Sequence, residues 1–123
     1  MLITATVTAV GSQALDATDP LVILFGEDAT PALRDIAVIQ RFASAKAQAA
    51  LVVKRGDQLM IDAVTYTITR VGQLANTNLQ TIGHVSLIFT EIPDQPMENA
   101  LYLEPQVKPQ LTVGSQLTYV TAD

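Results

Sequence analysis

ITATVTAVG, residues 3–11, alternates apolar and hydroxyl-bearing side chains before it reaches a glycine. Successive side chains of a strand point to opposite faces of a sheet, so this period of two indicates a strand with one buried face. VTYTITRVG, residues 64–72, has the same alternation and ends in the same way. Threonine is β-branched and favours a pleated surface. These two stretches predict a fold built mainly from strands.

Further short segments have the composition of strands and bring the expected total to about nine. They are residues 21–25, 36–42, 49–53, 58–61, 84–90, 100–103 and 116–120. Residues 54–57, KRGD, have the composition of a hairpin connection. Helical signals are few: residues 73–82 carry apolar side chains at helical spacing before Gly83, and Thr30-Pro31 can begin a single turn. The pattern predicts an all-β, barrel-like fold with one or two short helices.

A repeated sequence motif suggests that the barrel consists of two pseudo-repeated halves. TAVG at residues 8–11 returns as TRVG at residues 69–72. Each copy leads through a connector to another apolar strand, residues 21–25 in the first case and 85–89 in the second. In this interpretation the glycine lies where the chain leaves the sheet sharply, and two half-barrels pack their apolar faces together. The alternative is a chance resemblance between two strand-turn units.

Length and composition limit the class of protein. A chain of 123 residues has the size of one compact domain, so residues 1–123 are expected to form a single domain. No apolar stretch approaches the ~18 residues that a membrane-spanning helix needs, so no direct membrane span is expected. The N-terminus shows no signal-peptide pattern. The absence of cysteine rules out disulfides and thiolate chemistry and suits a reducing cytosol, so a cytoplasmic location is expected.

The net charge limits the classes of partner that the chain can bind. Seven basic residues against twelve acidic ones give a formal net charge of -5. Such a surface repels a phosphate backbone, so nucleic acid is not expected as a partner. Lys46, Lys54 and Arg55 make a small local excess of positive charge. This patch is either solvated surface or a weak attraction for an acidic protein.

Few side chains are suited to catalysis. The sequence has one histidine and no cysteine, and its carboxylates are scattered without the spacing of a metal site. It also has no glycine-rich phosphate loop, nucleophile elbow or dinucleotide-binding fingerprint. We therefore expect no cofactor and no metal, and a nucleotide-dependent enzyme is disfavoured.

His84 is the one side chain with obvious nucleophilic chemistry. It follows Gly83, begins a predicted strand and shares a face of that strand with Ser86. Neutral imidazole is a competent nucleophile near pH 7 and can accept a phosphoryl group. The alternative interpretation is a histidine that hydrogen-bonds the end of the preceding helix.

Several motifs, in this order and spacing, resemble those of the glucitol/sorbitol-specific enzyme IIA family of the bacterial sugar phosphotransferase system. They are residues 8–12 (TAVGS), 21–25 (LVILF), 68–72 (ITRVG), 78–87 (NLQTIGHVSL) and 114–117 (GSQL). The resemblance implies a cytoplasmic phosphocarrier without a bound cofactor, an enzyme in the narrow sense of a phosphotransferase component. It implies two partners, the histidine-containing phosphocarrier protein and the IIB/IIC components of the sorbitol permease, which the chain would meet transiently at the inner face of the membrane.

The resemblance also implies a site, and here the sequence departs from the family. The family's usual acceptor is the histidine of an Ile-His pair that ends a strand, and the matching pair here is Ile39-Gln40. A carboxamide nitrogen is a poor nucleophile, so Gln40 cannot accept the phosphoryl group.

Three alternatives follow from this departure. In the first, His84 is the acceptor and Gln40 only lines the site, with Ser86, Thr65, Thr67 or backbone amides near Gly83 holding the phosphoryl oxygens. In the second, the chain is a non-catalytic interaction or regulatory module of the permease that has lost the phosphohistidine. In the third, the matching of Gln40 is wrong by one strand, which still leaves His84 as the sole imidazole.

Overall fold

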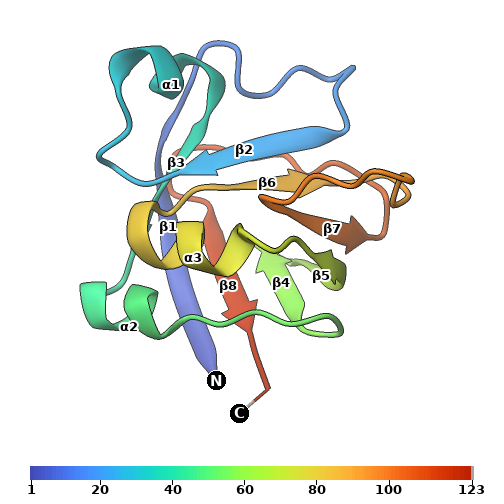
Figure 1. Ribbon diagram of the computed structural model, residues 1–123. Helices are drawn as coiled ribbons and strands as arrows, with labels where there is room; N and C mark the ends of the chain where they lie inside the picture. The colour runs from blue at the N-terminus through green and yellow to red at the C-terminus, as the bar shows by residue number, and fades with distance from the viewer. Residues whose placement is uncertain (123) are drawn as a thin grey trace.

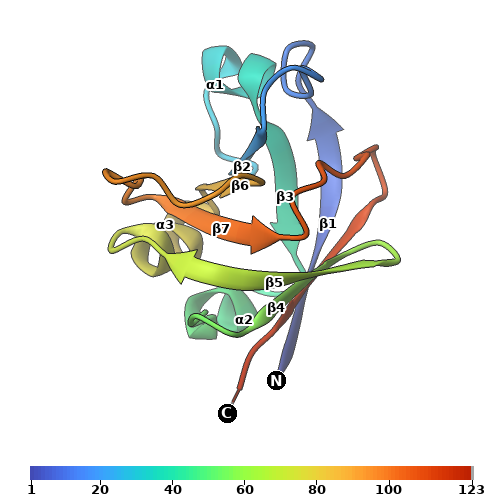
Figure 2. The ribbon, with the colours of Figure 1, turned by 90° about the vertical axis from the view of Figure 1, so that its right-hand side faces the viewer.

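The computed structural model describes residues 1–122, which form a closed barrel of eight strands (Figures 1 and 2). The strands are β1 (Leu2–Val10), β2 (Leu21–Phe25), β3 (Val38–Phe42), β4 (Gln58–Ile61), β5 (Val64–Val71), β6 (Val85–Ile88), β7 (Ala100–Glu104) and β8 (Gln116–Val120). Around the barrel their order is β1-β3-β2-β6-β7-β5-β4-β8. The prediction of a mainly β, barrel-like fold is confirmed.

Three short helices, α1 (Pro31–Ile36), α2 (Ala45–Ala50) and α3 (Ala75–Ile82), lie outside the barrel (Figure 1). The predicted start of α1 is confirmed, because the Thr30 hydroxyl accepts from the N–H of Leu33 and proline occupies the first turn. The predicted end of α3 is also confirmed, since Gly83 adopts a left-handed conformation with φ of 65°. None of the helices in residues 1–122 is long and apolar enough to cross a membrane.

The strand predicted at residues 49–53 is wrong. Residues 45–50 read AKAQAA, and alanine, lysine and glutamine are good helix formers. Ser44 caps this segment, with its hydroxyl accepting from the N–H of Ala47 at 3.0 Å, so α2 forms instead. Without that strand residues 54–57 make a turn and not a hairpin, although Gly56 has the positive φ expected of it, 94°.

Alternate residues of the strands divide between the barrel interior and an outer layer. The interior is filled by aliphatic and aromatic side chains, among them Val22, Leu24, Val85 and Leu87 of the paired strands β2 and β6. α1 and its flanks cover the outer face of β2 and β3, where Leu33 joins a small apolar cluster. The segment before β7 covers the outer face of that strand.

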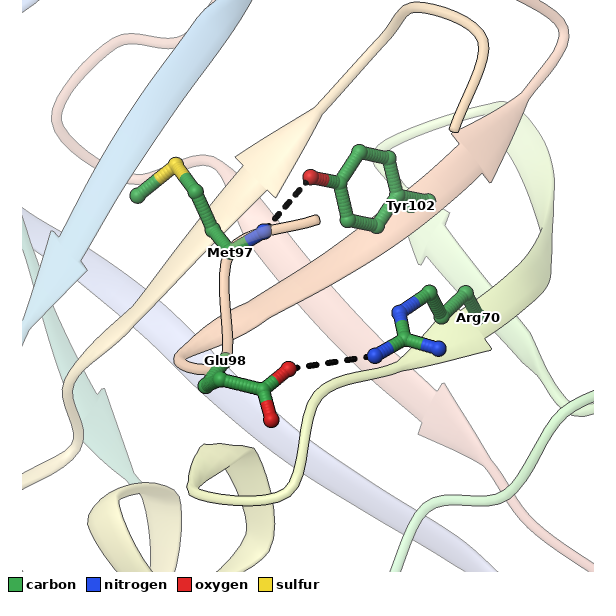
Figure 3. A network of polar contacts seen from close by, with 4 residues as sticks. All are labelled: Arg70, Met97, Glu98 and Tyr102. Atoms are coloured by element: carbon green, nitrogen blue, oxygen red, sulfur yellow. Dashed lines mark hydrogen bonds and ion pairs between the residues drawn. The ribbon is translucent and has the colours of Figure 1, made fainter. Parts of the chain in front are cut away.

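Figure 3 shows how the segment before β7 is held in place. The Met97 N–H donates to the Tyr102 hydroxyl at 3.0 Å, and the Arg70 guanidinium donates to the Glu98 carboxylate at 3.1 Å. Tyr102 belongs to β7 and Arg70 to the neighbouring strand β5. The segment is therefore joined to two strands of the barrel.

The predicted pair of related halves is confirmed by the topology. The half β8-β1-β3-β2 matches the half β4-β5-β7-β6 strand for strand, with a parallel pair, β2 with β3 or β6 with β7, in each. Gly11 and Gly72 occupy the same place in the two halves: their N–H groups donate to Ala37 O and Ala100 O, each at 2.9 Å. A Cβ at Gly11 would lie 2.1 Å from a backbone oxygen of α1, and one at Gly72 2.1 Å from Glu98 O. Close approach of two backbones therefore requires both glycines.

Candidate functional site

His84 lies at the junction between α3 and β6, and two glycines fix the path of the chain there. The N–H of His84 donates to Asn78 O at 3.2 Å and so closes the end of α3. Gly26, just after β2, donates its N–H to Ile82 O at 2.9 Å. A Cβ at Gly26 would lie 2.7 Å from that same oxygen, so only glycine lets the end of β2 approach α3 this closely.

The imidazole of His84 is oriented by β2. Its Nδ1 lies 3.0 Å from Leu24 O, and the ring of Phe25 stacks on it with centroids 4.4 Å apart. A carbonyl oxygen can only accept, so Nδ1 carries the hydrogen and Nε2 of the neutral ring keeps its lone pair. No hydrogen-bond partner for Nε2 is found within residues 1–122, and the side chain is half-buried. The ring is thus held as a single tautomer whose free nitrogen is nucleophilic.

The contacts of His84 bear on both interpretations of it from sequence. Its backbone N–H bonds the end of the preceding helix, as the alternative interpretation expects, whereas its ring bonds β2 through Nδ1. The neighbouring residues Val85 and Leu87 point into the barrel, so His84 lies on the outer face of β6.

Gln40 of β3 is a buried side chain with both polar atoms hydrogen-bonded. Its exposed fraction is 1%. Nε2 donates to Gly83 O at 2.9 Å, and Oε1 accepts from the Tyr119 hydroxyl at 2.8 Å. Burial raises the pKa of Tyr119 far above its usual value, and the hydrogen bond to Gln40 only partly opposes this shift, so the phenol stays neutral and donates. Tyr119, Gln40 and the Gly83 carbonyl form a continuous chain of hydrogen bonds that ends at the peptide bond between Gly83 and His84.

Gln40 also lines an open depression of about 290 Å³ between β3, α2 and the end of α3. Arg41, Ser44 and Gln48 bring polar groups to this depression, together with the acidic pair Glu27 and Asp28. His84 is not part of the lining. Gln40 and His84 are therefore linked through Gly83 but do not share one cavity.

The groups predicted to hold phosphoryl oxygens differ in their exposure and in their place in the barrel. Ser86 is buried, with an exposed fraction of 5%. Thr65 and Thr67 are exposed on β5, which β7 separates from β6. The backbone N–H groups of Gly83 and His84 already donate to carbonyls of α3.

Three contributors to the site were not predicted from the sequence: Leu24 O, the Phe25 ring and the Tyr119 hydroxyl. Phe25 does end a predicted strand next to a glycine, which is a weak signal for a ring at a strand end. The other two depend on the register between distant strands. Residues 1–122 contain no group of three His, Cys, Asp or Glu side chains that could hold a metal ion.

Comparison with known proteins identifies the family. The chain is 28% identical over 115 residues to the glucitol/sorbitol-specific EIIA components of the PTS system from Escherichia coli (strain K12) and Shigella flexneri, covering 93% of this chain and 90% of each relative. The crystal structure of a PTS system IIA component from Enterococcus faecalis V583 superposes with a TM-score of 0.90 at 40% identity, covering 96% of this chain and 99% of the other. Residues 2–118 match the family model described as PTS system glucitol/sorbitol-specific IIA component, and this chain belongs to that family.

Proposed function

We propose that this chain is a cytoplasmic phosphocarrier that takes a phosphoryl group from the histidine-containing phosphocarrier protein onto His84. It then passes the group to the IIB component of a glucitol/sorbitol permease during sugar uptake. Membership of the IIA family supports the pathway. The observation that carries the assignment of His84 is its hydrogen bond from Nδ1 to Leu24 O, which leaves Nε2 with a lone pair and without a partner among residues 1–122.

The proposed transfer is a displacement between two imidazoles. The Nε2 lone pair of His84 attacks the phosphorus of the donor's phosphohistidine and forms a new P–N bond. The donor's P–N bond breaks, and its electron pair returns to the donor ring. Nδ1 of His84 keeps its hydrogen throughout, so the phosphorylated ring is positively charged, and Leu24 O stabilises that charge. Transfer to the IIB component reverses these roles.

The surroundings of His84 suit transfer between two docked proteins. The imidazole lies on the outer face of the barrel and stacks on Phe25, beside Ile82, whose side chain is 43% exposed. A docking partner can cover this apolar surface, exclude water and align the two imidazoles. Because the amides of Gly83 and His84 are already bonded to α3, the phosphoryl oxygens would be held by side chains or by the partner.

A second candidate function is a non-catalytic module that binds the permease or a regulator through the same barrel. Gln40 is the observation that favours it, since an amide occupies the position that matches the family's usual acceptor. Both polar atoms of that amide are engaged in structural hydrogen bonds.

The test is to incubate the purified chain with phosphoenolpyruvate, the general phosphotransferase enzyme and the histidine phosphocarrier, and to look for an acid-labile adduct by intact-mass spectrometry. Wild type is compared with His84→Gln and with Gln40→His, which restores a histidine at the family's position. An adduct on wild type that His84→Gln loses supports the phosphocarrier. An adduct on Gln40→His with none on wild type shows that the donor is active and supports the non-catalytic module.

A further inference from the structure

A second depression, of about 800 Å³, lies away from both His84 and Gln40. It is bounded by residues 53–55 before β4, by the end of β5 and by the start of α3. No acidic residue belongs to its lining, whereas Lys54, Arg55 and Arg70 do. These are three of the chain's seven basic residues, gathered on a protein whose net charge is -5. Lys54 and Arg55 are exposed, whereas Arg70 is paired with Glu98, so the depression carries a small local excess of positive charge on an acidic molecule.

Arg70 retains unused hydrogen-bonding capacity at this depression. One of its terminal nitrogens, Nη2, is paired with the Glu98 carboxylate at 3.1 Å (Figure 3). Its Nε is buried and has no partner within residues 1–122. A guanidinium has five N–H donors, and a buried donor without a partner is unfavourable. The Arg70 side chain as a whole is about one-third exposed, so an acceptor can reach its terminal nitrogens.

The two other cations lie on a segment that is held in place. The side chain of Asn76, in the first turn of α3, accepts from Val53 N–H at 2.8 Å and donates to Val53 O at 3.0 Å. Lys54 N–H donates to the Asp57 carboxylate at 2.8 Å. These bonds fix the backbone that carries Lys54 and Arg55, so less order has to be imposed when a ligand binds.

One exposed apolar side chain lines the depression, and two more adjoin its lining residues in the sequence. Ile92 lines the depression and is 44% exposed. Val52 and Leu74, at 46% and 54% exposed, each adjoin a lining residue in the sequence. The first turn of α3 contains no acidic residue, so no side-chain charge opposes the positive end of the helix, although the N–H of Ala75 donates to Gly72 O. Arginine is enriched at protein-binding surfaces, and complementary charges across an interface select the partner.

We propose that this depression is a docking site for an acidic segment of a partner protein. Carboxylates of that segment bind Lys54, Arg55 and the terminal nitrogens of Arg70, and an apolar side chain of the segment packs against Ile92. Charge complementarity selects the partner, because the rest of this surface is acidic and repels carboxylates. This site involves none of the atoms assigned to phosphoryl transfer and extends beyond the proposed function.

The experiment is a titration of the full-length ¹⁵N-labelled chain, followed by NMR at low salt. The probes are a short blocked peptide of glutamate and leucine, its glutamine counterpart, and inorganic phosphate. The test variant is Arg55→Glu and the matched control is Lys46→Glu, which makes the same charge change at an exposed residue outside the depression. His84→Gln is titrated as well, so that the result does not depend on phosphoryl transfer.

The proposal predicts that the glutamate peptide shifts the amides of residues 53–55, 70–73 and 76, while the glutamine peptide does not. Arg55→Glu should weaken binding about tenfold, and Lys46→Glu and His84→Gln should leave it within about twofold of wild type. Shifts spread over the whole surface, or equal weakening by Lys46→Glu, would overturn the proposal. So would shifts at these amides with phosphate alone and none with the peptide, since that result would indicate a small-anion site.

Discussion

Tyr119→Phe tests the buried chain of hydrogen bonds that runs from Tyr119 of β8 through Gln40 of β3 to the peptide bond of His84. The substitution removes one hydroxyl and leaves Gln40 Oε1 without its donor inside the barrel. The ring itself keeps its place, because Tyr119 stacks on Phe42 with centroids 5.7 Å apart, and phenylalanine preserves that contact. A buried acceptor left unsatisfied costs about 1–3 kcal/mol, so we expect the free energy of unfolding to fall by that amount.

The matched control is Tyr66→Phe, which removes a hydroxyl that donates to Val107 O at 2.6 Å. Val107 is 65% exposed, so water can replace the lost donor, and we expect a smaller loss of about 0.5–1.5 kcal/mol. Both variants are measured by urea unfolding at neutral pH, with circular dichroism as the signal.

A double-mutant cycle then isolates the contact between Tyr119 and Gln40. Gln40→Leu removes the acceptor together with the donor to Gly83, so adding Tyr119→Phe to it should cost clearly less than Tyr119→Phe costs alone. Two results would contradict this: a change in the free energy of unfolding below about 0.5 kcal/mol for Tyr119→Phe, or losses from the two substitutions that are additive. Either would mean that this chain of hydrogen bonds does not stabilise the barrel.

Three further predictions concern pH, close packing and helix capping. Burial raises the pKa of both Tyr119 and Tyr66, so the stability that their neutral forms contribute is present below the unfolded value of about 10 and is lost as pH rises above it. Urea unfolding at pH 8 and pH 11 should show this loss in wild type and a smaller one in Tyr119→Phe. Gly72→Ala places a Cβ 2.1 Å from a backbone oxygen, so it should destabilise the barrel more than Gly56→Ala does. At Gly56 the added Cβ meets open space, and the cost is limited to about 1–2 kcal/mol for the positive φ. Thermal melts of the two variants compare these losses directly. Ser44→Ala removes the cap of α2 and should cost about 1 kcal/mol in the same melts, whereas unchanged stability would mean that tertiary contacts alone hold α2.

The parts of the fold that the sequence predicted are those with a strong local pattern. The alternation in residues 3–11 and 64–72 became β1 and β5, because in each strand one face packs into the barrel. The strand expected at residues 49–53 does not form, because a serine cap and alanines favour a helix there. The valines that follow made the segment resemble a strand.

The candidate site was less predictable because its contacts join residues far apart in the chain. His84 was identified as the one imidazole, but its bond to Leu24 spans 60 positions and depends on the register of β2 against β6. The contact between Gln40 and Tyr119 spans 79 positions, and it requires the barrel to close. A linear pattern contains no information on either register.

The most direct test of the central claim uses the fact that the chain has a single histidine. In ¹⁵N spectra of the imidazole, the two ring nitrogens can belong only to His84. The account predicts, for the neutral ring, a protonated Nδ1 and a lone pair on Nε2, and after incubation with the phosphocarrier system a coupling of Nε2 to ³¹P. A lone pair on Nδ1, or an imidazole spectrum that does not change while Gln40→His becomes phosphorylated, would contradict it.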